Sequence, residues 1–156
     1  MSNQTKKHEN SIDLARLPDY LGYQIRQAQT AVFKDIETKM KAIGVTPGEF
    51  GLLTIVKANP GINQKALTNL YGLDKSTLSY AVNRLVDRKW ISSKRDPKDG
   101  RYFGLWVTPT GGAKADAATD HIAKQEDLMD TVLEKGERQQ LLSMLVRISA
   151  VLKLSQ

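Results

Sequence analysis

Hydrophobic residues recur at intervals of three and four along most of the chain, a spacing that predicts amphipathic helices joined by short polar turns. The predicted helices cover residues 18–42, 47–58, 64–71, 75–89, 109–133 and 137–154. The pattern changes over residues 90–107, where two strand-like runs, 90–94 and 102–107, flank a charged loop that contains Pro97 and Gly100. Such a loop between two strands indicates a β-hairpin. The chain is therefore predicted to be mainly α with a small β-hairpin wing.

Residues at the predicted helix ends fit these boundaries. Thr46 and Glu49 form a capping box around Pro47, which suits the first position of a helix. Asn63 and Asp74 are N-cap residues for the two short helices that follow, and Gly44 and Gly136 are placed to end or break helices. The periodicity also predicts apolar stripes that face inward: Leu21, Ile25, Ala28, Val32 and Ile36 in the first helix; Ala66, Leu67 and Leu70 in the third; Leu78, Val82, Leu85 and Val86 in the fourth.

Two short helices, a tight turn at Gly72-Leu73 and a basic hairpin form the pattern of a winged helix-turn-helix, which binds double-stranded DNA. The apolar stripe of helix 75–89 leaves a polar face that suits the major groove. We expect base contacts from Ser76, Ser79, Tyr80 and Asn83, and phosphate contacts from Lys75, Thr77 and Arg84. The alternative interpretation is an ordinary solvated helix face.

The hairpin loop supplies a second set of candidate DNA contacts, namely Lys94, Arg95, Lys98, Asp99 and Arg101. Asp99 lies two residues before Arg101, so its carboxylate is placed to orient the guanidinium for entry into a narrow minor groove. The alternative is an exposed ion pair of little energetic value.

Charge and composition narrow the function classes. Of the net charge of +6, most comes from residues 61–107, which carry nine Lys/Arg and four Asp/Glu, as phosphate binding requires. The chain has no cysteine, and His8 and His121 lie far apart, so we expect no disulfide, thiol sensor, metal or other cofactor. No catalytic constellation is recognisable, which argues against an enzyme. A polar N-terminus and the absence of a long apolar run predict a cytoplasmic protein.

The motif Arg95-x-x-x-Asp99-Gly100-Arg101 resembles the wing of the MarR family of bacterial transcriptional regulators. Residues 45–50 look like that family's entry to its second helix, and residues 63–90 look like its helix-turn-helix. The strand end Leu105-Trp106-Val107-Thr108 departs mildly from the family's usual Val-x-Leu-Thr. The resemblance covers about residues 17–154. It implies a DNA-binding lobe over 46–108 and dimerization helices over 17–43 and 109–154. The polar residues 1–16 lie outside the resemblance and are expected to form a flexible N-terminal arm.

The last helix independently favours a dimer, because Leu141, Leu145, Ile148 and Leu152 form one apolar stripe while Leu142, Met144 and Val151 add apolar surface elsewhere. The alternative is that it packs on its own domain. A two-fold dimer fits a pseudo-palindromic operator.

The resemblance also implies a repressor that releases DNA on binding a small ligand, such as an aromatic acid or its acyl-CoA thioester. An arginine beside aromatic rings suits a planar carboxylate or a phosphate. The candidate ligand-binding residues are Arg16, Tyr20, Tyr23, Arg26, Gln27, Thr30 and Phe33. The alternative is that Tyr23 and Phe33 belong to the core and that Arg26 is a surface or interface charge. A further alternative for the whole chain is a winged-helix module for protein contact or non-specific DNA binding.

Overall fold

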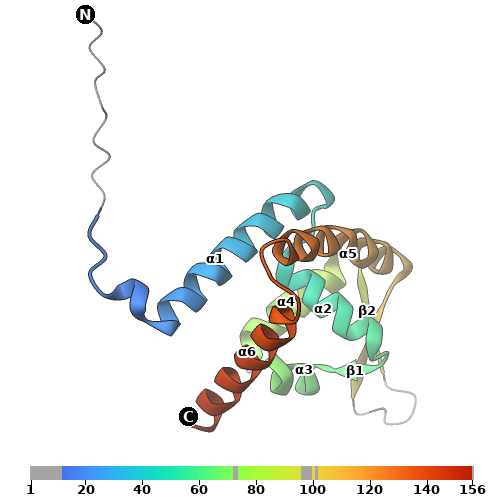
Figure 1. The fold of residues 1–156 in the computed structure, drawn as a ribbon. Coiled ribbons are helices and arrows are strands. Elements are labelled where there is room, and N and C mark those ends of the chain that lie inside the picture. Colours follow the sequence, from blue (N-terminus) through green and yellow to red (C-terminus); the bar gives the residue numbers. More distant parts are fainter. Residues whose placement is uncertain (1–11, 72–73, 96–99, 101, 156) are drawn as a thin grey trace, which may run out of the picture. The chain divides into compact units, whose positions relative to one another are not determined.

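The computed structural model describes residues 12–71, 74–95, 100 and 102–155. It divides into two compact units, residues 1–35 and 36–156, which are each described by themselves. The elements in chain order are η1 (Leu17–Asp19), α1 (Leu21–Met40), η2 (Lys41–Ile43), α2 (Pro47–Ala58), β1 (Ile62–Asn63), α3 (Gln64–Tyr71), α4 (Lys75–Asp87), β2 (Ile91–Arg95), β3 (Phe103–Val107), α5 (Pro109–Asp130) and α6 (Glu137–Leu154). The chain is thus mainly helical with a small antiparallel sheet, as predicted (Figure 1).

The predicted caps set most helix boundaries. Thr46 and Glu49 form the complete capping box of α2, and the Asn63 side chain accepts a hydrogen bond from the Ala66 N–H at 2.9 Å. Gly44 follows η2 with a φ of 68°, a left-handed conformation that glycine adopts readily. The prediction of one uninterrupted helix over 18–42 was wrong at its ends, because short 3₁₀ segments, η1 and η2, precede and follow α1. The fifth helix ends at Asp130, three residues before the predicted end.

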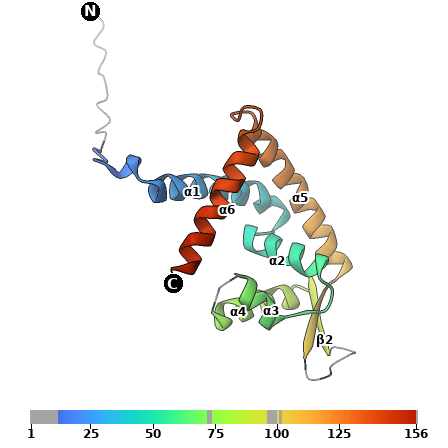
Figure 2. The same cartoon turned by 60° about the horizontal axis from the view of Figure 1, so that its bottom comes forward.

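The sheet has the strand order β1-β3-β2, and both pairings are antiparallel. The predicted hairpin is present, with Ile91 opposite Val107 and Arg95 opposite Phe103. The periodicity did not predict β1, because a two-residue strand shows no alternation. Gly104 makes this edge possible, since a Cβ there would lie 2.8 Å from the Gly61 carbonyl oxygen. In Figure 2 the strands extend from the N-terminal end of α5, with α3 and α4 beside them.

The core of the second unit joins α2, α3, α4, the sheet and α5. Its buried members include Leu53, Leu67, Leu85, Leu105 and Ala118, contributed by these elements in turn. The predicted stripe of α4 is confirmed at Leu78, Val82 and Leu85, with Val86 partly buried.

Two predicted stripes were partly wrong. In α3 only Leu67 is buried, while Ala66 and Leu70 are exposed, because the half-buried positions Gln64 and Thr68 share the inner face with Leu67. In the first helix Ile36 is buried, but Leu21 and Ile25 are exposed. Leu21 retains 72% and Ile25 36% of its accessible surface.

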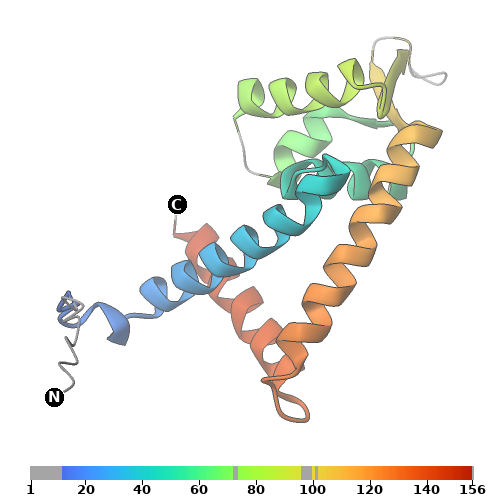
Figure 3. The ribbon, with the colours of Figure 1, turned by 90° about the horizontal axis from the view of Figure 1, so that it is seen from above.

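A short turn joins α5 to α6 (Figure 3). Gly136 precedes α6 with a φ of 92°, and the Glu134 N–H donates to Glu137 Oε2 at 2.8 Å. Arg138 in the first turn of α6 donates to Asp130 Oδ1 and Glu126 Oε2, both at 2.6 Å. Among the described residues, no helix combines the length and apolarity needed to cross a membrane.

Candidate nucleic-acid interface

Asp74 is the N-cap of α4, the second helix of the helix-turn-helix. Its carboxylate accepts from the Thr77 N–H at 2.9 Å and the Thr77 hydroxyl at 2.6 Å, and it also accepts from the Ser76 hydroxyl. The hydroxyls of Ser76 and Thr77 and the Thr77 N–H hold the pKa of Asp74 well below its ordinary value of 3.8. With their protons donated to Asp74, both hydroxyls offer acceptors to an incoming base amino group.

The Asp74 cap predicts a pH-dependent contribution to stability. Because the folded pKa is lowered, the charged cap stabilises the fold fully above the ordinary pKa of 3.8, and this contribution is lost as the pH falls through the folded value. We therefore expect wild type to exceed Asp74→Asn in the free energy of unfolding by a constant amount from pH 8 to about pH 5, with the difference narrowing below about pH 4. Urea denaturation followed by circular dichroism at several pH values measures it. A difference that grows on acidification would contradict this role.

The face of α4 predicted to enter DNA is largely free in this structure. Lys75, Ser76, Thr77, Tyr80 and Asn83 are exposed, and Tyr80 retains 68% of its accessible surface. Ser79 differs, because it is half-buried and its hydroxyl donates to Gln64 Oε1 of α3 at 3.4 Å.

Arg84 is exposed along half of its side chain but already has a partner. Its Nη2 lies 3.3 Å from Oε1 of the buried Glu49, which belongs to α2. Glu49 Oε1 thus competes with a DNA phosphate for Arg84 Nη2, while the guanidinium has further N–H donors.

A groove of about 610 Å³ borders the N-terminal end of α4. It is lined by Asn63, Gln64, Lys65, Lys75, Ser93, Tyr102, Phe103 and Leu105. Of this set only Lys75 was predicted from the sequence as a DNA contact. The others come from α3, the sheet and its flanks, and only the fold brings them together. Two lysines and exposed aromatic rings suit a phosphate backbone that passes along this surface.

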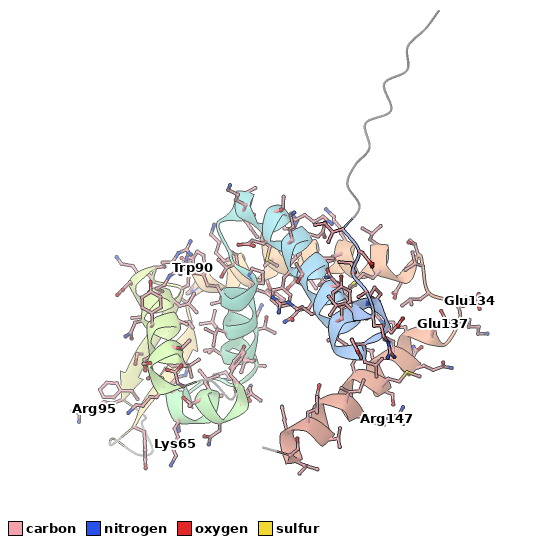
Figure 4. All side chains as sticks on the ribbon, turned by 90° about the vertical axis from the view of Figure 1, so that its left-hand side faces the viewer. Lys65, Trp90, Arg95, Glu134, Glu137 and Arg147 are labelled. Carbon is pink, nitrogen blue, oxygen red and sulfur yellow. The ribbon has the colours of Figure 1, made fainter. Side chains whose placement is uncertain are left out.

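The described part of the wing is also basic. Lys94 and Arg95 are exposed on β2, and the Arg95 guanidinium lies 5.9 Å from the ring centroid of Phe103. Figure 4 shows Lys65 and Arg95 projecting on the same side of this lobe. The predicted contacts Lys98, Asp99 and Arg101 lie outside the described residues.

Comparisons with known proteins place this lobe in a family. The MarR family model matches residues 43–101. A protein named as a transcriptional regulatory protein for the hcr operon of Thauera aromatica is 31% identical over 129 residues, which are 82% of this chain and 78% of that protein. The chain belongs to the MarR family. This MarR chain is a transcriptional regulator, as the sequence resemblance implied.

Solved structures extend the similarity over most of this MarR-family chain. The repressor CouR bound to a 23-mer DNA duplex has a TM-score of 0.81 and 30% identity, covering 88% of this chain and 98% of CouR. CouR bound to p-coumaroyl-CoA has a TM-score of 0.80 and 29% identity, covering 88% and 97%. PcaV from Streptomyces coelicolor, in complex with its natural ligand, has a TM-score of 0.77 and 25% identity, covering 89% and 98%.

The predicted ligand-binding residues all belong to the unit of residues 1–35. Tyr23 is half-buried, whereas Arg16, Tyr20, Arg26, Gln27, Thr30 and Phe33 are exposed. Arg16 is 3.8 Å from Asp19, and the Thr30 hydroxyl donates to the Arg26 carbonyl oxygen at 2.8 Å. Tyr23, Arg26, Gln27 and Thr30 follow helical spacing on α1, so they share one face. Within the described residues no group of His, Asp or Glu is arranged to hold a metal ion.

Proposed function

We propose that this chain is a homodimeric repressor that binds a specific pseudo-palindromic DNA operator and leaves it when a small effector binds. The observation that carries the proposal is the free polar face of α4 beside a groove lined by two lysines. The similarity to DNA-bound CouR supports the same use of this lobe. Such a regulator acts in the cytoplasm, where the chromosome is accessible, and it needs neither catalysis nor a cofactor.

The proposed DNA contacts are those that the sequence predicts, extended by one lysine. Ser76, Ser79, Tyr80 and Asn83 face the bases, and Lys75, Thr77 and Arg84 bind phosphates. Lys94, Arg95, Lys98, Asp99 and Arg101 form the wing contact. Lys65 joins the phosphate set because it lines the same groove as Lys75.

The proposed dimer divides the chain into a DNA-binding lobe, dimerization helices and an N-terminal arm. Residues 1–16 form an arm, residues 46–108 form the DNA-binding lobe, and residues 17–43 and 109–154 supply the dimerization helices. The exposure of α6 supports this division, because none of its residues is buried although it carries the apolar residues Leu141, Leu145 and Leu152. A second copy of the chain would cover this apolar surface.

The effector belongs to the class of aromatic acids and their coenzyme A thioesters. CouR is solved with p-coumaroyl-CoA and PcaV with its natural ligand, and both resemble this chain over most of its length. Arg16 and Arg26 would bind carboxylate or phosphate, Tyr20, Tyr23 and Phe33 would contact the ring, and Gln27 and Thr30 would add hydrogen bonds. Release requires that the effector bind the DNA-incompetent state more tightly.

Selection of binding sites from a random duplex library tests this function and identifies the operator sequence in the same experiment. Wild type should enrich a pseudo-palindrome and bind it in anisotropy titrations despite excess random duplex. Enrichment of no sequence would instead support the alternative module, used for protein contact or non-specific DNA binding. Aromatic acids and their thioesters are then added to the complex, and a fall in anisotropy identifies the effector class.

The basic groove makes a separate prediction about salt dependence. The proposed dimer carries each substitution twice. Lys65→Gln and Lys75→Gln should therefore each reduce the magnitude of the slope of log K against log salt by about two, one phosphate contact for each half-site. Lys124→Gln is the matched control, since it removes the same charge from an exposed position of α5. An unchanged slope for Lys65→Gln would place the DNA backbone elsewhere.

A further inference from the structure

Arg88, the residue directly after α4, binds three neighbours with one guanidinium group. Its Nη1 donates to Glu49 Oε1 at 2.9 Å, and its Nη2 donates to the Gly44 carbonyl oxygen at 2.7 Å. The guanidinium carbon also lies 3.6 Å from the ring centroid of Trp90. The planar fork of arginine suits such a set of contacts, because it bonds two acceptors and stacks on a ring at the same time. Both terminal nitrogens of Arg88 therefore have acceptors within the protein, although a third of the side chain stays exposed.

Glu49 joins this arginine to the start of α2. The carboxylate is buried, with 6% of the residue exposed, and its Oε2 accepts from the Thr46 N–H at 2.9 Å. Its Oε1 accepts from both Arg88 and Arg84, but the Arg84 contact is longer, at 3.3 Å against 2.9 Å. When Arg84 turns to a phosphate, Glu49 keeps Arg88 as its partner, so no buried charge is left alone.

The turn at residues 43–44 is held from a second side by α5. Lys114 Nζ donates to the Ile43 carbonyl oxygen at 2.7 Å and lies 5.7 Å from the Trp90 ring centroid. Adjacent carbonyls of one turn thus bind a cation from the end of α4 and a cation from α5.

We propose that Arg88 is a positioning residue for DNA recognition, which fixes the C-terminal end of α4 against α2 and the 43–44 turn without touching DNA. This inference rests on the proposed function, because it assigns to Arg88 the placement of the DNA-reading face. It gives different roles to two arginines that share the Glu49 carboxylate: Arg84 of α4 binds a phosphate, and Arg88, directly after α4, holds Glu49 and the 43–44 turn.

The test uses full-length protein and the duplex selected by wild type, titrated by anisotropy at several salt concentrations. Arg88→Gln should bind about tenfold more weakly, with an unchanged salt slope, because no phosphate contact is lost. Arg84→Gln should reduce the magnitude of the salt slope by about two, because the dimer loses one phosphate contact at each half-site. Lys57→Gln is the matched control: it removes the 2.6 Å ion pair with Asp116 between α2 and α5, and should bind as wild type does.

Two further measurements separate positioning from loss of fold. Arg88→Lys keeps the charge but cannot bond both acceptors in one plane, so it should also weaken binding at an unchanged slope. Hydrogen exchange of the free protein should quicken in the last turn of α4 for both Arg88 variants and not for Lys57→Gln.

Three results would overturn the proposal. Binding by Arg88→Gln and Arg88→Lys at wild-type strength would remove the positioning role. A salt slope reduced in magnitude by about two in Arg88→Gln would make Arg88 a direct phosphate contact in each protomer. If wild type selects no sequence at all, the proposed function fails and this inference fails with it.

Discussion

Gly111→Ala is expected to destabilise the DNA-binding lobe severely, by roughly 3 kcal/mol. A Cβ at this position would lie 2.0 Å from the Trp90 carbonyl oxygen and 3.0 Å from the Trp90 Cα. The carbonyl cannot move aside freely, because it accepts from the Thr108 N–H at 3.0 Å. The first turn of α5 therefore packs directly on the backbone that leads from α4 into β2, and only glycine fits there.

Gly112→Ala is the matched control for this prediction. A Cβ at Gly112 would have no atom within 4 Å, and the position lies inside α5. Alanine there should stabilise the protein by about 0.5–1 kcal/mol, because glycine loses more backbone entropy on folding. Urea denaturation of both variants measures the contrast. Equal effects at the two positions would show that the close approach of α5 to Trp90 does not limit side-chain size.

Helix ends were predictable because their chemistry is local. Thr46, Asp74 and Gly136 each act on residues within a few positions along the chain, and each was placed correctly from the sequence. The strand β1 was not predictable, because it exists through two residues that face β3 where Gly104 leaves room. The prediction that Leu70 of α3 faces inward was wrong for a related reason, because the neighbours of a short helix decide which side it buries.

The candidate DNA interface also contains features that the sequence predicts and features that only the fold shows. Helical periodicity alone identified the exposed face of α4, including Tyr80 and Asn83. Periodicity could not show that Arg84 is paired with Glu49, 35 residues away, or that Lys65 lines one groove with Lys75. Such contacts depend on how distant elements pack, and a single sequence does not specify them. The roles of all these residues on DNA stay predictions.

Leu145→Glu is expected to break the dimer and, with it, tight operator binding. Leu145 belongs to the apolar surface of α6, a helix with no buried residue. Its apolar residues Leu141, Leu142, Met144 and Leu152 are all at least 46% exposed. A two-fold axis places each substitution in the interface twice. Losing about 1.5 kcal/mol of burial per side should raise the dimer dissociation constant by about 100-fold or more. Sedimentation velocity measures the dimer, and anisotropy with the selected operator measures its consequence.

Gln140→Glu adds the same charge to an exposed polar position of α6 and should leave the dimer intact. A monomer binds one half-site only and loses the high effective concentration that the first contact gives to the second. Leu145→Glu should therefore lose operator affinity in parallel with its dimer, and high protein concentration should restore part of it. A Leu145→Glu protein that stays dimeric would place the subunit interface outside α6. A monomer that keeps wild-type affinity would mean that a single winged lobe suffices for operator binding, because a monomer contacts only one half-site.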